Sequence, residues 1–367
     1  MCHGAGIRIP SPRVSRITQL LLREFRCFRE LCYDPGDGLN FITGPNARGK
    51  TSVLEAACFL MRLRSPRTST LGELVRFGQP SFMLEGLLQR EEGEIRLGVT
   101  CTPPARSLKL DGVQQSSSAE YLKQGAIVWF GSDDLLLVNG PAERRRKLLD
   151  SAGLQIGGSY GRDLRDYDRA LRSRNLLLRE GRSRREIEAY DRPLAETGDR
   201  ILCFRKRLVN ALSAFVADAC RKISGEKLEI FYEPGSVSPM IESLASSREE
   251  EIRLRQTRVG PQRDELAMLL NGIPAGSFAS EGQRRTIALA LKLAVASLLS
   301  SENGSPPLLL LDDIFGELDP SRRGALLAGM PLGAQALLST AELTGILIPE
   351  GARIHRFVEG DTLAAML

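Results

Sequence analysis

The chain has 367 residues, 42% of them hydrophobic and 26% charged, which is ordinary for a globular protein of two structural units. Its net charge of +5, from 50 Lys and Arg against 45 Asp and Glu, permits nucleic-acid binding without indicating it. The seven scattered cysteines contain no C-x-x-C pair, which argues against a zinc site or a disulfide framework and fits a reducing cytoplasm. No apolar run reaches membrane-spanning length.

The N-terminal part of the chain predicts a phosphate-binding loop. Residues 1–14 lack the apolar core of a signal peptide, and we expect a disordered leader there. Strand signals follow between 16 and 28, Leu39–Thr43 predicts another strand, and a helical pattern begins after Thr51. Between that strand and that helix lies the sequence Gly44-Pro45-Asn46-Ala47-Arg48-Gly49-Lys50-Thr51. This is the G-x-x-x-x-G-K-T pattern of a P-loop in its strand–loop–helix context, and all eight residues are candidate ATP contacts.

The chemistry of a P-loop explains these residue types. Gly44 and Gly49 allow the backbone to turn its N–H groups onto phosphate oxygens. We expect Lys50 to reach the β- and γ-phosphates, and Thr51 to hold Mg²⁺ through its hydroxyl. A chance glycine-rich turn is the alternative, and the flanking strand and helix disfavour it. Arg26 lies between aromatic residues, and the sequence leaves open whether it touches the nucleotide or is an ordinary surface arginine.

The middle of the chain predicts a small sheet and then a helical insertion. Alternating segments between 83 and 110, with Asp111-Gly112 as a turn, predict antiparallel strands beside the P-loop core. The pattern becomes mostly helical over 114–257. We therefore expect an ATPase head formed by 15–113 and 258–367, interrupted by a helical arm.

The expected arm carries several basic clusters. Arg144, Arg145 and Arg146 follow Gly140-Pro141 in the first turns of a predicted helix. A single cluster of this kind is usually a solvated helix face, whereas several on one arm favour DNA contacts. The three arginines are therefore candidate DNA contacts, with internal salt bridges as the alternative.

The stretch from 277 to 319 predicts a second phosphate site and a catalytic strand end. Ser280-Glu281-Gly282-Gln283 opens a helix, where a hydroxyl, a glycine and free amides suit an anion. The four leucines of Leu308–Leu311 predict a strand buried on both faces of a parallel sheet. The Asp312-Asp313 pair that ends this strand would lie where open α/β sheets bind ligands. Gly316-Glu317-Leu318-Asp319 follows it.

The order of these motifs resembles the ATP-binding-cassette heads of the SMC class and, within that class, the RecF family of bacterial recombination mediators. The segments that carry the resemblance are Phe25-Arg26-Cys27-Phe28, Gly44 to Thr51, Gly140-Pro141-Ala142-Glu143-Arg144-Arg145-Arg146, Gly260-Pro261-Gln262-Arg263-Asp264, Gly282 to Ala294, and Leu310-Leu311-Asp312-Asp313. Together they cover the chain from about residue 16 to its end. Ala47, Gln262 and Ser132 depart from the family pattern, which tends to have glycine, histidine and proline there.

The resemblance implies an α/β fold, an ABC-type P-loop ATPase head with a mixed sheet core, an antiparallel β-subdomain and a mostly helical inserted arm. It implies a weak, Mg²⁺-dependent ATPase in which Asp312 and Thr51 hold the metal and Asp313 acts as base. Asp313 replaces the usual glutamate and is one methylene shorter, which predicts slow turnover. Ser280, Gly282 and Gln283 would contact ATP bound by a second copy, and Asp319 would belong to the dimer loop.

The function implied is ATP-dependent DNA binding in recombinational repair and replication-fork maintenance, by a cytoplasmic protein that dimerises on ATP. Gapped DNA or duplex/single-strand junctions, and the mediators RecR and RecO, are the partners that the resemblance implies. Two other functions use similar heads. A transporter motor subunit is disfavoured by the insertion and by the absence of a histidine after the strand at 335–340. An SMC-type tether requires a long heptad coiled coil, for which 114–257 is too short and irregular.

Overall fold

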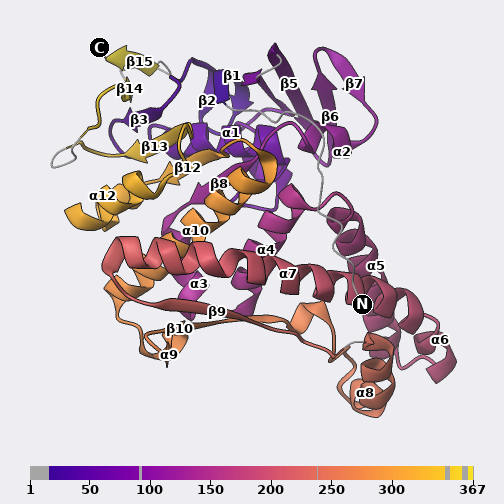
Figure 1. Ribbon diagram of the computed structural model, residues 1–367. Helices are drawn as coiled ribbons and strands as arrows, with labels where there is room; N and C mark the ends of the chain where they lie inside the picture. Colours follow the sequence, from indigo (N-terminus) through magenta and orange to yellow (C-terminus); the bar gives the residue numbers. More distant parts are fainter. Residues whose placement is uncertain (1–15, 91–92, 238, 344–347, 358–362, 367) are drawn as a thin grey trace. The chain divides into compact units, whose positions relative to one another are not determined.

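The computed structural model describes residues 16–90, 93–237, 239–343, 348–357 and 363–366 (Figure 1). The leader expected at 1–14 lies outside the described residues. The chain divides into two units, which are described separately. The head comprises the described residues through Asp134, together with 222–224 and those from Leu289 onward, and the arm comprises Leu135–Arg221 and Gly225–Ala288.

A largely parallel sheet forms the core of the head, with the strand order β15-β14-β3-β13-β12-β8. Its strands are β3 (Leu39–Thr43), β8 (Ile127–Phe130), β12 (Leu308–Asp312), β13 (Ala336–Thr340), β14 (Arg353–Phe357) and β15 (Leu363–Met366). β12 pairs in parallel with both β13 and β8, and its four leucines are buried, which confirms the predicted interior strand. Because β3, β13 and β12 run parallel, the P-loop and the aspartate pair follow strand ends at the same edge of the sheet.

A second, antiparallel sheet of the head has the strand order β2-β1-β4-β5-β6-β7. Its strands are β1 (Arg16–Phe25), β2 (Phe28–Tyr33), β4 (Phe82–Arg90), β5 (Gly93–Thr102), β6 (Ala105–Leu110) and β7 (Val113–Gln115). Asp111 and Gly112 have φ of 48° and 80° and form the predicted turn between β6 and β7. Arg26 has φ of 55°, so Phe25 to Phe28 is a tight hairpin turn between β1 and β2.

Helix α1 (Lys50–Arg62) packs between the two sheets of the head. It contacts β12 and β13 on one side and β1, β4 and β5 on the other, and all of its residues except Thr51 and Arg62 are buried. A helix that is apolar nearly all round requires cover on every side. Since α1 begins at Lys50, this packing fixes the start of the helix against the end of β12. Other helical segments of the head are η1 (Leu71–Leu74), α2 (Ser118–Leu122), η2 (Ser132–Leu135), α11 (Ile314–Glu317) and α12 (Pro320–Gly329), together with the part of α10 (Glu281–Asn303) from Leu289 onward.

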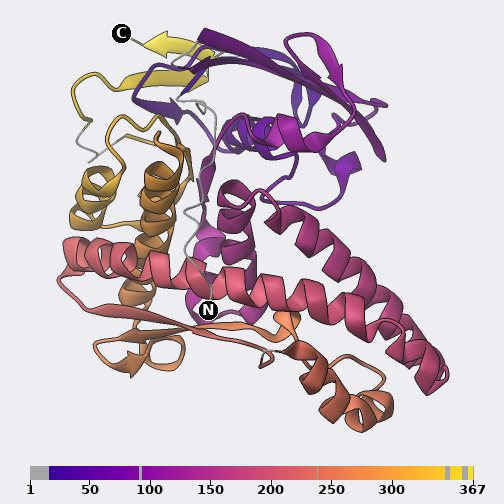
Figure 2. The same cartoon turned by 45° about the vertical axis from the view of Figure 1, so that its right-hand side comes forward.

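The arm combines helices with a three-stranded sheet of order β11-β10-β9 (Figure 2). Its elements are α3 (Leu136–Asn139), α4 (Ala142–Ile156), α5 (Tyr160–Glu180), α6 (Arg184–Glu188), α7 (Asp191–Ser224), β9 (Leu228–Glu233), α8 (Met240–Leu254), η3 (Pro261–Arg263), β10 (Glu265–Leu270), β11 (Ile273–Pro274) and α9 (Ala275–Phe278), and α10 (Glu281–Asn303) begins in it. No helix among the described residues is long and apolar enough to cross a bilayer.

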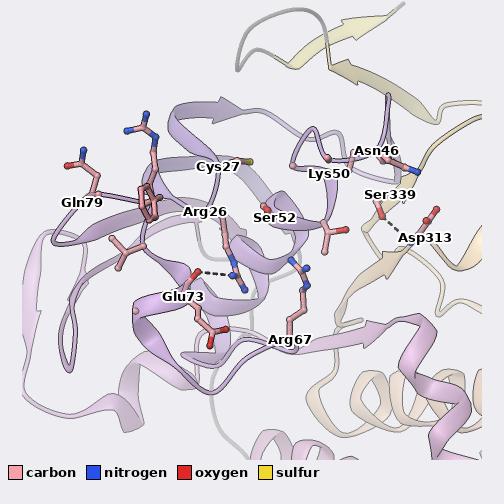
Figure 3. A pocket seen from close by; sticks show the side chains of 18 residues that line it. Arg26, Cys27, Asn46, Lys50, Ser52, Arg67, Glu73, Gln79, Asp313 and Ser339 are labelled. Atoms are coloured by element: carbon pink, nitrogen blue, oxygen red, sulfur yellow. Dashed lines mark hydrogen bonds between the residues drawn. The ribbon is translucent and has the colours of Figure 1, made fainter.

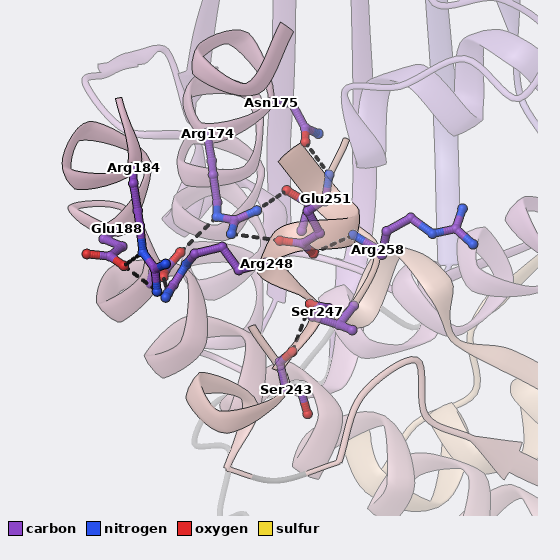
Figure 4. A network of polar contacts seen from close by, with 12 residues as sticks. Arg174, Asn175, Arg184, Glu188, Ser243, Ser247, Arg248, Glu251 and Arg258 are labelled. Atoms are coloured by element: carbon purple, nitrogen blue, oxygen red, sulfur yellow. Dashed lines mark hydrogen bonds and ion pairs between the residues drawn. The ribbon is translucent and has the colours of Figure 1, made fainter. Parts of the chain in front are cut away.

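Buried ion pairs hold the arm helices together (Figure 4). The Arg174 side chain of α5 has no exposed surface, and its guanidinium pairs with Asp191 at 2.9 Å and Glu251 at 2.7 Å. It also donates to the Thr257 hydroxyl at 2.8 Å. A buried charge without such partners would cost several kcal/mol. The network therefore connects α5, α7 and α8.

The boundaries of the two units differ from those expected at 114–257. Strand β8 lies in the parallel sheet of the head, since Ile127 to Phe130 pair with Leu308 to Leu311. Strand β10 belongs to the arm, because Glu265 to Leu270 pair with β9. The local residue pattern of a strand favours a β conformation, but it cannot show which distant strand it pairs with.

Candidate nucleotide-binding and catalytic site

The P-loop between β3 and α1 has a backbone that requires its glycines. Gly44 and Gly49 have φ of 137° and 91°, in the region that L-residues rarely adopt. A Cβ added to Gly49 would lie 2.4 Å from Cζ of Phe28 and 2.7 Å from Sγ of Cys27. The hairpin turn between β1 and β2 therefore closes one side of the loop, and only glycine fits against it.

Lys50 lies under this loop, at the start of α1. Its Nζ donates to the carbonyl oxygens of Gly44 at 2.7 Å and Pro45 at 3.0 Å, and to Oδ1 of Asn46 at 3.4 Å. Burial lowers the pKa of Lys50, while the nearby carboxylates of Asp313 and Asp312 raise it. The predicted strand–loop–helix setting of this lysine is confirmed. The structure shows in addition that its ammonium group lies near the carboxylates of Asp312 and Asp313.

Asp312 lies at the end of β12, where two hydroxyl groups converge on it. Its Oδ1 accepts hydrogen bonds from Oγ1 of Thr51 at 2.6 Å and from Oγ of Ser339 at 2.8 Å. The structure thus brings together the two residues predicted to hold Mg²⁺. A hydroxyl beside one carboxylate, with phosphate oxygens completing the shell, is a donor set that suits this ion. Sequence reasoning missed Ser339, although the end of a core strand at 335–340 was a signal for it.

Asp313 has a strained backbone and a perturbed side chain. Its φ of 54° is left-handed, and its N–H donates to Oγ of Ser339 at 3.0 Å. Burial raises the pKa of Asp313, the charge of Asp312 raises it further, and Lys50 lowers it. Backbone strain of this kind costs about 1–3 kcal/mol and clusters at functional sites. Both features fit a base held in one orientation.

One pocket of about 850 Å³ connects these groups (Figure 3). Asp313, Ser339 and the β1–β2 turn line it, together with five residues of the P-loop: Asn46, Ala47, Gly49, Lys50 and Thr51. The volume lies within the range of small-molecule sites. The phosphate loop, the lysine and the candidate base thus face the same space.

Arg26 lines the pocket, and partners within the head hold its guanidinium. It pairs through Nε and one terminal nitrogen with both oxygens of Glu55, at 2.8 and 2.7 Å. Its other terminal nitrogen donates to the carbonyl oxygen of Glu73 at 2.7 Å. The hydrogen bond to Glu55 raises the pKa of Arg26. Glu55 is fully buried in the apolar helix α1. Because a buried carboxylate needs a cationic partner, a single acidic residue in an apolar helix was the sequence signal that could have indicated the Arg26 pair.

The residues predicted to contact a second copy's nucleotide lie at the start of α10. Ser280 and Gln283 form a reciprocal cap: the Ser280 N–H donates to Oε1 of Gln283 at 2.9 Å, and the Gln283 N–H donates to Oγ of Ser280 at 3.3 Å. Nε2 of Gln283 also donates to Glu226 at 2.7 Å, a partner that the sequence did not indicate. Gly282 lies within this first turn. Asp319, predicted in the dimer loop, caps α12 by accepting from the Arg322 N–H at 2.9 Å. The contacts to a second copy stay a prediction.

Comparison with known proteins identifies the family. Over 356 residues, 93% of this chain and 95% of the relative, the chain is 35% identical to the DNA replication and repair protein RecF of Symbiobacterium thermophilum. The chain belongs to the RecF family. A solved structure of the recombination mediator protein RecF with ATPrS in the RecFOR pathway covers 97% of this chain and is itself covered completely, with a TM-score of 0.89 and 29% identity. Residues 19–99 match the family described as the AAA domain.

The comparisons also confirm the expected fold class. The Smc head domain of Pyrococcus furiosus, solved with an extended coiled coil, covers 97% of this chain with a TM-score of 0.59 and 16% identity. At that identity the likeness shows the fold alone. The chain therefore has the ABC-type α/β head that RecF proteins share with SMC heads.

The departures from the RecF family pattern have local consequences. Ala47 has φ of 65°, a left-handed conformation in which glycine is unstrained. Gln262 accepts a hydrogen bond from the Tyr167 hydroxyl and donates to the carbonyl oxygen of Val259 at 2.8 Å. Its amide therefore ties α5 to the segment before η3 in place of the usual histidine.

Ala47→Gly is expected to stabilise the protein by about 0.5–1 kcal/mol. Relief of left-handed strain is worth about 1–2 kcal/mol and outweighs the extra chain entropy of glycine, about 0.4–1 kcal/mol. The measurement is the free energy of unfolding in urea without nucleotide. Ala245→Gly, at an exposed interior position of α8, is the matched control and should destabilise. Destabilisation by both substitutions would contradict the strain at Ala47.

The candidate DNA contacts on α4 have internal partners. Arg145 is 8% exposed, pairs with both carboxylate oxygens of Glu265, and donates to the carbonyl oxygen of Gly140 at 2.9 Å. Arg146 donates to the carbonyl oxygen of Asp264 at 2.9 Å. This geometry favours the internal salt bridge over a DNA contact for Arg145. The half-buried Arg146 has an internal hydrogen bond and keeps some surface for a DNA contact. Arg144 stays a candidate DNA contact.

Proposed function

We propose that the protein is an ATP-dependent DNA-binding ATPase of recombinational repair and replication-fork maintenance, which dimerises on ATP and is released by slow hydrolysis. The observation that carries this proposal is one pocket lined by Lys50, Thr51 and the strained Asp313, with Asp312 hydrogen-bonded to the Thr51 hydroxyl. Relatives named as DNA replication and repair proteins support the biological setting. They favour neither a transporter subunit nor a structural tether.

The residues of the pocket divide the work of hydrolysis. Loop amides and Lys50 hold the phosphates, while Thr51 and Asp312 would hold Mg²⁺, which would neutralise charge on the β- and γ-phosphates. Asp313 orients a water molecule whose oxygen attacks the γ-phosphorus as the bond to the bridging β–γ oxygen breaks. The water proton passes to the Asp313 carboxylate or to the phosphate. The short reach of an aspartate keeps the reaction slow.

The capped start of α10 supports the dimer. Ser280 and Gly282 offer a hydroxyl and helix N-terminal amides to an anion, yet the chain already has a P-loop for its own phosphates. Two copies related by a two-fold axis would use both sites twice, with two ATP molecules between them. Only ATP presents a γ-phosphate to Ser280, so ATP and not ADP would stabilise the pair. DNA, preferably gapped or with a duplex/single-strand junction, and the mediators RecR and RecO are the partners proposed, in the cytoplasm.

Ser280→Arg should leave ATP binding intact and abolish the ATP-dependent dimer, since the larger cation fills the γ-phosphate position. The measurements are light scattering with saturating ATP or ADP, and binding to gapped DNA with each nucleotide. The parent should form a dimer and bind gapped DNA more tightly with ATP alone. The variant should lose both responses.

The matched control is Ser246→Arg, at an exposed position of α8 outside the predicted nucleotide contacts, and it should behave like the parent. Equal dimerisation by ATP and ADP would refute the γ-phosphate mechanism. Loss of the dimer with retained ATP-dependent DNA binding would show that DNA binding does not need the dimer, and would contradict the proposed mechanism.

A further inference from the structure

The nucleotide pocket has an end that the phosphate machinery does not use. Its lining includes the segment from Arg76 to Gln79, which follows η1. In Figure 3, Gln79 lies on the far side of the pocket from Lys50 and Asp313. A nucleoside triphosphate bound at the P-loop therefore has a second wall available for its sugar and base.

Among the described residues that line this pocket, Phe77 is the only aromatic one, and it is 100% exposed. Phe25 and Phe28, which flank the pocket-lining residues Arg26 and Cys27 in the β1–β2 turn, are 0% and 1% exposed. Their rings pack inside the head on Phe82 and Phe357. Phe25 and Phe28 are thus unavailable for stacking, whereas the whole ring of Phe77 is accessible.

A tight turn presents the Phe77 ring. The Gln79 N–H donates to the carbonyl oxygen of Arg76 at 3.0 Å, and Gly78 has φ of 82°, which together define a type II turn with Phe77 at its second position. The turn is anchored to β1, because the Arg76 N–H donates to the Glu24 carbonyl oxygen at 2.8 Å and its guanidinium pairs with the Glu24 carboxylate at 3.1 Å. An anchored turn loses little entropy on binding.

The β1–β2 turn fixes the position of the Arg76–Gln79 turn relative to the P-loop. The Arg26 N–H donates to the carbonyl oxygen of Leu74 at 2.8 Å, just before the turn. The neighbouring Cys27 closes against Gly49 of the P-loop. The β1–β2 turn therefore joins the loop that holds phosphate to the turn that holds Phe77.

We propose that Phe77 is the base-stacking residue of the nucleotide site, on which the ring of a purine nucleoside triphosphate lies while its phosphates occupy the P-loop. The proposal deepens the proposed function and rests on it. Stacking uses the π-face that every base shares, so Phe77 supplies affinity without reading the base edge. Its removal should cost nucleotides about 10-fold in affinity or more, by the usual strength of base–aromatic stacking.

The test compares ATP, GTP and inorganic tripolyphosphate, each titrated with Mg²⁺ into the full chain and its variants. Phe77→Ala should weaken ATP and GTP alike, by about 10-fold or more, and leave tripolyphosphate unchanged. Phe77→Tyr should restore nucleotide affinity. Leu332→Ala removes an apolar side chain that is 99% exposed outside the pocket and should change nothing.

Three outcomes would overturn the proposal. ATP affinity in Phe77→Ala equal to the parent would show that no stacking occurs. An equal loss for ATP and tripolyphosphate would assign Phe77 to the structure of the loop. Failure of the parent to bind any of the three ligands would instead refute the P-loop assignment, and the stacking role with it, so the two failures are distinguishable.

Discussion

Lys50→Ala is expected to lower ATP affinity by about 100-fold or more, beyond detection in most direct titrations. Charge-assisted hydrogen bonds are worth about 1.5–3 kcal/mol each, and one ammonium reaches two phosphates. No other lysine lines the pocket among the described residues. The arginines that do are already paired: Arg26 and Arg67 with Glu55, and Arg76 with Glu24.

The measurement is a calorimetric titration with Mg²⁺-ATP on variants whose circular dichroism matches the parent, because Lys50 also holds the P-loop backbone through the carbonyl oxygens of Gly44 and Pro45. Lys147→Ala removes an exposed lysine paired with Glu143 on α4 and serves as the control, with affinity expected to stay at the parent value. An unchanged affinity for ATP in Lys50→Ala would overturn the P-loop assignment.

Asp313→Asn is expected to retain ATP binding and to slow hydrolysis by about 100- to 10,000-fold, the usual contribution of a general base. An amide keeps the shape of the carboxylate but cannot accept a proton, so the ATP-bound dimer should accumulate. The measurement is phosphate release under single-turnover conditions together with light scattering. Hydrolysis at the parent rate would exclude Asp313 as the base.

The pH dependence of the parent adds a second readout. The base acts only when ionised, and burial with the charge of Asp312 raises the pKa of Asp313. Hydrolysis should therefore fall as pH drops through a pKa above the ordinary aspartate range, and Asp313→Asn should remove that limb. Asp37→Asn, a side chain that is 77% exposed and paired with Arg16, is the control and should leave the profile unchanged.

Local patterns made the nucleotide site and much of the fold predictable. The P-loop could be read because its glycines, lysine and threonine are contiguous and each meets a local requirement of backbone or charge. The four leucines of β12 and the Asp111-Gly112 turn, with φ of 48° and 80°, likewise carry their structure within a few residues. One local signal misleads: Glu249-Glu250-Glu251 is typical of a helix start, yet these residues lie in the C-terminal half of α8. That helix starts at Met240, directly after Pro239.

By itself, then, the sequence determined the P-loop, the aspartate pair and the family, because those signals are local or fixed by order along the chain. Only the tertiary structure decided that Ser339 joins Thr51 at Asp312, that Arg26 and Arg145 are held by Glu55 and Glu265, and that β8 lies in the head. The reason is physical: a charged side chain is buried only where a partner from a distant segment meets it, and the pairing of distant strands leaves no periodic trace in either strand.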